Sequence, residues 1–166
     1  MSLRTLFWPF MALLLFASCL PVKYGLDELP DQQLRFGSGG GIAGSFQEYL
    51  LLANGQIFLF ELGFGKSDTF ELQALSKSDA RILYKEMDSL RLHKYDFNYP
   101  GNMSYFIRQA DEMTEHTVQW GNPRWEVRPD VAEFFTQLNA IVDNRKVIFD
   151  VKKDKEELKD KEPTFW

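Results

Sequence analysis

The stretch SFQEYLLLANGQIFLFEL, residues 45–62, decides the fold predicted for this chain. Two apolar runs flank Asn54-Gly55, and both turn residues tolerate the positive φ angles that a two-residue hairpin turn requires. The sequence therefore predicts an antiparallel hairpin of strands 45–53 and 56–62. A third strand is expected at 69–75, where apolar and polar residues alternate.

Two amphipathic helices are expected further along the chain. Ser76 has the character of an N-cap, and apolar residues then recur at helical spacing as far as Leu90. Pro129 suits a first helical position, and an apolar stripe follows it up to Val142. Each helix therefore has one apolar face to bury against a sheet.

A second hairpin is expected between the two helices, with strands at 103–110 and 115–121. A further short strand is expected at Lys146–Val151. The predicted order is β-β-β-α-β-β-α. This order indicates an α+β domain with a largely antiparallel sheet of about five to six strands and two helices packed on one face.

The composition excludes several classes of protein. A chain of 166 residues suits one domain. A net charge of −5 argues against a nucleic-acid-binding protein, which would carry a basic surface. One cysteine excludes an internal disulfide framework, and two histidines leave little for a zinc site. We therefore expect no metal and no cofactor.

The N-terminal residues are typical of an export signal. Arg4 precedes an apolar run from Leu6 to Ala17, which would measure about 18 Å as a helix. A bilayer core is about 30 Å thick, so this run is short for a transmembrane helix. A basic start, a short apolar core and small residues at its end are typical of a secretory signal peptide.

The end of that run, Leu15-Phe16-Ala17-Ser18-Cys19, resembles the lipobox of bacterial lipoproteins. This resemblance implies that a lipid is attached to the Cys19 thiol and that cleavage makes Cys19 the first residue of the mature protein. Several acyl chains on one residue would hold a domain firmly on a membrane. Residue 20 is leucine rather than the aspartate that retains some lipoproteins in the inner membrane, which favours the outer membrane.

The chain as a whole resembles small envelope lipoproteins of Gram-negative bacteria, in particular of the Bacteroidota type. Besides the lipobox, the resemblance is carried by the glycine-rich segment 36–44, by residues 54–56 and by the loop 120–123. It implies a protein anchored in the envelope that faces the periplasm or the cell surface. It implies no catalytic residues and no particular oligomeric state.

The chain is thus divided into four parts. Residues 1–18 are expected to form the signal peptide and 19–33 a lipidated tether, which carries two prolines and has no clear period. Residues 34–151 form the α+β domain. Residues 152–166 form a charged tail with too little apolar surface to offset the entropy of ordering.

Aromatic residues in two expected loops are the candidates for a binding surface. Phe97 and Tyr99 lie in one loop, and Arg124 and Trp125 lie in the other. Aromatic rings beside asparagine and arginine can form a platform for a sugar or a peptide. The alternative is that these rings plug the end of the sheet.

Two other patterns receive structural interpretations. Gly39, Gly41 and Gly44 satisfy G-x-G-x-x-G, but a hairpin follows them instead of the helix that a dinucleotide site requires. A bulge or loop that needs positive φ is therefore expected there. His93 and His116 lie on different elements and are expected to have structural roles.

Two functional hypotheses follow from these patterns. The first is a non-enzymatic, membrane-tethered binding domain whose partner is an envelope protein or a glycan. The second is a small envelope hydrolase or inhibitor that uses a carboxylate pair not identifiable from sequence. A carboxylate pair in a deep cleft would favour the enzyme, whereas a shallow aromatic patch around Tyr99 and Trp125 would favour binding.

Overall fold

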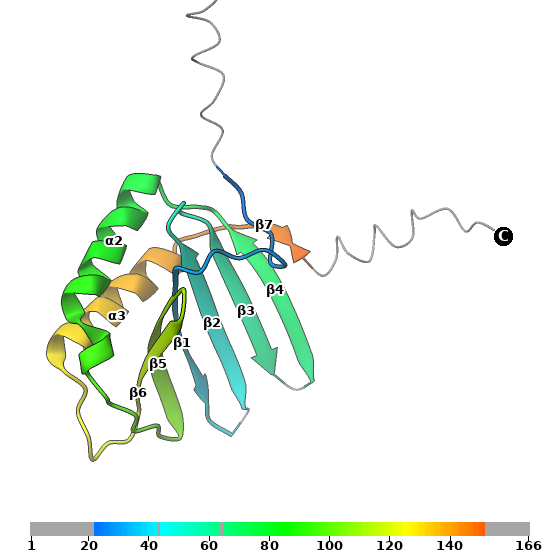
Figure 1. The fold of residues 1–166 in the computed structure, drawn as a ribbon. Helices are drawn as coiled ribbons and strands as arrows, with labels where there is room; N and C mark the ends of the chain where they lie inside the picture. Colours follow the sequence, from blue (N-terminus) through cyan, green and yellow to red (C-terminus); the bar gives the residue numbers. More distant parts are fainter. Residues whose placement is uncertain (1–21, 43, 64, 152–166) are drawn as a thin grey trace, which may run out of the picture.

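The computed structural model describes residues 22–42, 44–63 and 65–151. Within these residues the chain forms one antiparallel sheet of seven strands in the order β6-β5-β1-β2-β3-β4-β7, with two helices (Figure 1). The α+β class and the antiparallel pairing predicted from sequence are therefore confirmed. The strands are β1 (Gln33–Gly40), β2 (Ser45–Leu52), β3 (Ile57–Gly63), β4 (Lys66–Leu72), β5 (Met103–Asp111), β6 (Thr114–Trp120) and β7 (Val147–Asp150).

The two helices form where the apolar spacing predicted them. In α2 (Lys77–Leu90) the Ser76 side chain accepts a hydrogen bond from the backbone amide of Asp79 at 3.1 Å. Pro129 occupies the start of α3 (Pro129–Val142). A short 3₁₀ helix, η1 (Leu92–Lys94), follows α2. Both long helices lie on the same face of the sheet, as expected (Figure 1).

The main core lies between this face and the helices. Leu34, Leu51 and Ile57 contribute from the sheet, and each is at most 2% exposed. Met87 of α2 and Phe134 of α3 are buried against them. Burial of large apolar side chains contributes about 1.5 to 3 kcal/mol each. The helices therefore stay on the sheet through their apolar stripes.

The number of strands is seven rather than the five to six predicted. The additional strand is β1, which the sequence placed partly in a glycine-rich bulge or loop. Glycine has no side chain, so the glycines of β1 interrupt the alternation of apolar and polar residues from which a strand is predicted. The glycine-rich turn itself lies further on, where Gly41 and Gly44 have φ angles of 72° and 57°. β7 agrees with the short strand expected at 146–151.

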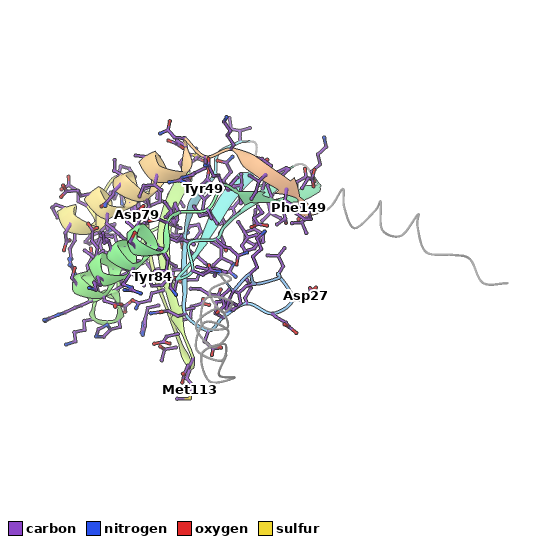
Figure 2. All side chains as sticks on the ribbon, turned by 90° about the horizontal axis from the view of Figure 1, so that it is seen from above. Asp27, Tyr49, Asp79, Tyr84, Met113 and Phe149 are labelled. Carbon is purple, nitrogen blue, oxygen red and sulfur yellow. The ribbon has the colours of Figure 1, made fainter. Side chains whose placement is uncertain are left out.

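The segment that precedes β1 covers the part of the second face that lies near the Asn54-Gly55 turn. Tyr24, Leu26 and Leu29 pack against a small cluster of Leu50, Leu52 and Phe58. Seen from above, the helices lie on one side of the sheet and the segment that carries Asp27 lies on the other (Figure 2).

The sequence assigned residues 19–33 to a lipidated tether; within this range Tyr24, Leu26 and Leu29 pack on the sheet and Gln33 begins β1. The reason is that apolar side chains on the second face need cover from water.

Three predicted parts of the chain lie outside the described residues. These are the signal peptide 1–18, the lipid attachment residue Cys19 and the charged tail 152–166. In the part of the chain that the structure describes, neither helix has the length and apolar character needed to cross a bilayer.

Candidate functional site

The two aromatic loops expected to form a binding surface meet at the outer edge of β6. The backbone amide of Gln119 donates to the carbonyl oxygen of Phe97, and the amide of Tyr99 donates to the carbonyl oxygen of Gln119, both at 2.9 Å. The amide of Asn122 then donates to the carbonyl oxygen of Tyr99 at 3.1 Å. The loop residues 97–99 thus pair with the free edge of β6, and this pairing fixes the position of the aromatic side chains.

The rings of Tyr99 and Trp125 stack on each other. Their centroids are 4.8 Å apart and their planes differ by 23°. Tyr99 is 38% exposed and Trp125 is 52% exposed, so both rings reach solvent. We call this pair the aromatic platform. Arg124 lies beside it and is exposed.

Phe97 does not belong to the exposed surface that the sequence predicted. It is only 9% exposed, because it belongs to the main core and stacks on Tyr95 with centroids 5.2 Å apart. Its ring meets Tyr99 edge-on at 4.8 Å. The guanidinium of Arg128 lies over the Tyr95 ring at 4.9 Å. Phe97 therefore supports the platform from below and plugs the sheet edge. The surface interpretation fits the exposed rings of Tyr99 and Trp125, and the plugging interpretation fits Phe97.

A second candidate site is an open groove of about 480 Å³ on the helix-bearing face of the sheet, lined by strand residues and by none from the helices. Strand register places four polar residues opposite one another in a row across β1, β2, β3 and β4. They are Ser38, Gln47, Glu61 and Asp68.

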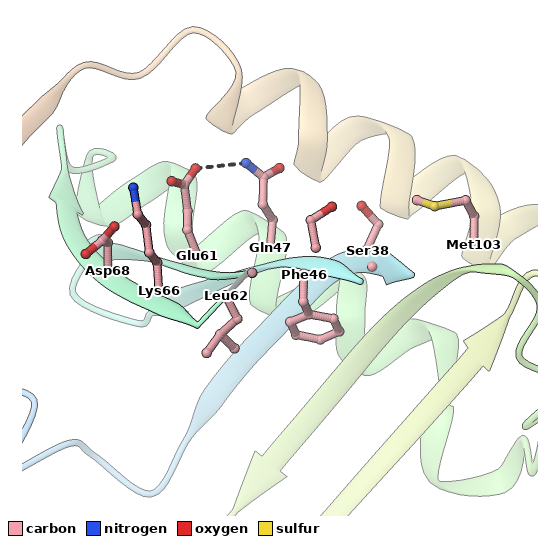
Figure 3. Close-up of a pocket in the computed structure, with 11 residues that line it drawn as sticks. Ser38, Phe46, Gln47, Glu61, Leu62, Lys66, Asp68 and Met103 are labelled. Atoms are coloured by element: carbon pink, nitrogen blue, oxygen red, sulfur yellow. Dashed lines mark hydrogen bonds between the residues drawn. The ribbon is translucent and has the colours of Figure 1, made fainter. Parts of the chain in front are cut away.

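Figure 3 shows Gln47, Glu61 and Lys66 pointing into the groove, whereas Phe46 and Leu62 point to the other face of the sheet. Gln47 donates from Nε2 to Oε1 of Glu61 at 2.9 Å.

The groove is acidic, with one lysine at its margin. Burial, followed by the charges of Asp143 and Glu61, raises the pKa of the Tyr49 hydroxyl in the neighbouring row. Glu61 and Asp68 face each other across β3 and β4, so the groove brings together two carboxylates. Such a pair can bind hydroxyl or ammonium groups, and it is also the residue pair that a glycoside hydrolase uses.

The histidines lie away from this groove. His93 follows α2 and His116 lies on β6, with ring centroids 6.2 Å apart. The sequence placed them on separate elements and did not predict that they approach each other. Among the described residues, no cluster of three or more His, Cys, Asp or Glu side chains could hold a metal ion.

Sequence reasoning missed the polar row because it depends on the register of four strands. The available signal was weak. Gln47 and Glu61 lie in apolar strands, near the ends farther from Asn54-Gly55. Polar side chains there indicate that the cover over this face ends before the strands do.

Comparison of the chain with protein-family models, with curated proteins and with solved structures finds no match. The functional conclusion therefore depends on the geometry of the two candidate sites and on the N-terminal sequence pattern.

Proposed function

We propose that the protein is a lipid-anchored envelope lipoprotein whose domain binds a glycan on the aromatic platform. The observation that carries the binding role is the stacked and exposed pair Tyr99 and Trp125. The anchor is supported by the lipobox pattern that ends at Cys19. The outer membrane, with the domain facing the periplasm or the cell surface, is the location this pattern favours.

The chemistry of the platform suits a sugar ring. Aromatic faces carry a partial negative charge that attracts the C–H groups on the flat face of a sugar. Arg124, exposed in the same loop, supplies donors for hydroxyl or carboxylate oxygens. Backbone bonds between residues 97–99 and β6 hold Tyr99 in place, so little conformational entropy is lost on binding.

The anchor is tested by the change Cys19→Ala. We expect the variant to lose incorporation of labelled fatty acid and to move from the membrane fraction to the soluble fraction. Ser18→Ala keeps a small residue before the cysteine and serves as the control, so it should still be labelled. Retention of Cys19→Ala on membranes after a high-salt wash would show that the anchor is wrong.

The platform is tested by Tyr99→Ala and Trp125→Ala. Loss of one ring contact is expected to weaken glycan binding by about tenfold, which corresponds to roughly 1.4 kcal/mol. Ile82→Ala, which removes an exposed apolar side chain from α2, is the control. Binding would be measured by isothermal titration calorimetry with envelope glycan fragments, which needs no tryptophan signal. Unchanged affinity in both aromatic variants would exclude the platform, and peptide binding with the same losses would assign it to a peptide.

A second candidate function, a small hydrolase, is favoured by the cross-strand pair Glu61 and Asp68. Wild-type protein would be incubated with the same glycan fragments and the products separated. Cleavage that is lost in Glu61→Gln but kept in Ser38→Ala would favour the enzyme. Binding without cleavage would favour the non-enzymatic role.

A further inference from the structure

Exposed apolar side chains gather where the described chain begins. Val22 is 63% exposed, Ile148 is 54% exposed and Phe149 is 43% exposed. Val22 and Ile148 line one cavity of about 510 Å³ together with Tyr24. Phe149 and Tyr24 line the neighbouring one. We call Val22, Ile148 and Phe149 the apolar rim (the N-terminal segment and β7 meet there in Figure 1).

The start of the described chain is held firmly in this position. The side chain of Gln56 is buried, accepts from the backbone amide of Tyr24 at 2.7 Å and donates to its carbonyl oxygen at 3.2 Å. The side-chain amide of Asn54 donates to the carbonyl oxygen of Val22 at 2.7 Å. Lys23 pairs with Glu71 at 3.2 Å. The described chain therefore begins at a fixed point within the rim.

The distance from this point to the anchor is short. Cys19 and Val22 are three residues apart in the sequence. A fully extended chain spans at most about 3.6 Å per residue, so their Cα atoms are within about 11 Å of each other. A lipid on Cys19 would bring Val22, and with it the rest of the rim, to the surface of the bilayer.

We propose that the apolar rim rests on the lipid bilayer to which Cys19 is anchored. This inference rests on the lipid attachment proposed above. The rim side chains insert at the boundary between headgroups and acyl chains, where partly apolar surfaces are stabilised. The rim orients the domain, while the acyl chains hold it on the membrane.

The orientation has a consequence for the binding sites. Register pairs Gln33 with Leu52 at the rim end of the strands and Gly40 with Met103 at the far end. Strands of eight residues are about 26 Å long. The groove and the aromatic platform lie toward the far end, so they face away from the membrane.

The experiment uses lipidated full-length protein with one added cysteine. Lipid blocks the Cys19 thiol, so Ile148→Cys or Val22→Cys provides the free thiol for an environment-sensitive fluorophore. The control is Ile42→Cys in the turn between β1 and β2, at the far end of the sheet, where Ile42 is fully exposed. The proteins are reconstituted into vesicles of phosphatidylethanolamine and phosphatidylglycerol at about one molecule per vesicle.

At positions 148 and 22 we expect the fluorophore emission to shift to the blue and its quenching by an aqueous quencher to fall several-fold. Neither change is expected at position 42. Equal quenching at the three positions in protein whose mass confirms the lipid overturns the inference and leaves the anchor intact. Absence of lipid in the mass spectrum refutes the proposed anchor instead.

A second copy of the chain is the competing occupant of the rim. Labelled Cys19→Ala protein is therefore also measured without vesicles. A blue shift at position 148 that grows with protein concentration there assigns the rim to self-association and overturns the membrane contact.

Discussion

At the scale of single residues, Tyr84 joins α2 to the sheet through a buried hydrogen bond. Its hydroxyl donates to the carbonyl oxygen of Leu51 at 2.7 Å. Burial raises the pKa of this hydroxyl well above its ordinary value of about 10. The proton is therefore held more tightly in the folded state than in the unfolded state.

The change Tyr84→Phe should lower the free energy of unfolding by about 1 to 2 kcal/mol at pH 7, because the carbonyl of Leu51 loses a buried donor. The tyrosine contribution is fully present below about pH 10 and is lost as the pH rises toward the folded-state pKa. The gap between wild type and variant should therefore narrow above pH 10. Urea unfolding from pH 7 to 11 measures this, with Tyr99→Phe as the exposed control. A gap that widens with pH would contradict the assignment.

Arg91 is the one described residue other than glycine that has a positive φ angle, 51°, and it ends α2. An L side chain in this conformation costs about 1 to 2 kcal/mol, and glycine avoids most of this cost. Arg91→Gly should therefore raise the free energy of unfolding by about 0.5 to 1 kcal/mol after the greater freedom of the unfolded chain is counted. Lys85→Gly, in the exposed helix interior, should lower it by about 1 kcal/mol. Thermal unfolding of both variants checks the opposite signs.

At the scale of elements, the glycines of β1 have a packing role on the second face of the sheet. Phe46 of β2 and Phe106 of β5 stack across β1 with centroids 5.4 Å apart and planes within 6°. Register places them opposite Gly39 and Gly37. A Cβ on Gly39 would lie 2.2 Å from the Phe46 ring. The two rings cover the strand because its glycines leave the space open.

Gly39→Ala should therefore destabilise the domain by more than about 1 kcal/mol, since the Phe46 ring must leave its stacked position. Gly63→Ala is the matched control in β3, where the added Cβ meets its nearest atom at an ordinary 3.5 Å. It should be neutral or slightly stabilising. Chemical denaturation compares the two, and equal losses would show that any alanine in these strands is tolerated poorly.

At the scale of the whole molecule, the two edges of the sheet differ. Residues 97–99 pair along the edge of β6, whereas β7 is a four-residue strand with exposed apolar side chains. Short edge strands limit unwanted pairing with other chains. β7 still protects the edge of β4. Just beyond the two strands, the carbonyl oxygen of Lys146 accepts a hydrogen bond from the amide of Gln73 at 2.8 Å.

Two truncations separate the contribution of β7 from that of the charged tail. Deletion of residues 152–166 should leave the unfolding midpoint nearly unchanged, as the composition of this stretch predicts. Deletion of 146–166 should lower stability by at least about 1 kcal/mol and promote aggregation, because β4 becomes an open edge. Scanning fluorimetry with light scattering measures both. A large drop in the shorter truncation would show that the tail packs on the domain.

Local sequence patterns predicted most of the helices and strands. The features that were missed depend on contacts between residues far apart in the sequence. The period of α3 and the turn at Asn54-Gly55 were sufficient to predict a helix and a hairpin. β1 was missed because its glycines pack through side chains from β2 and β5. The cover provided by Tyr24 was missed because it depends on a glutamine 32 residues away.

The aromatic platform was predicted in part, since Tyr99 and Trp125 meet but Phe97 is buried. The acidic groove needs the register of four strands, which single-sequence patterns do not contain.

The position of β1 between β2 and β5 also determines the order of folding. Strands β1 to β4 pair with their neighbours in the chain, and so do β5 and β6. The ladder between β1 and β5 must instead join Gln33 to Ala110 across a loop that includes all of α2. The entropy of closing that long loop is lost before its contacts form, so this docking step is expected to limit the folding rate. Until β1 and β5 pair, Phe106 stays exposed, and the partly folded chain has its greatest tendency to aggregate.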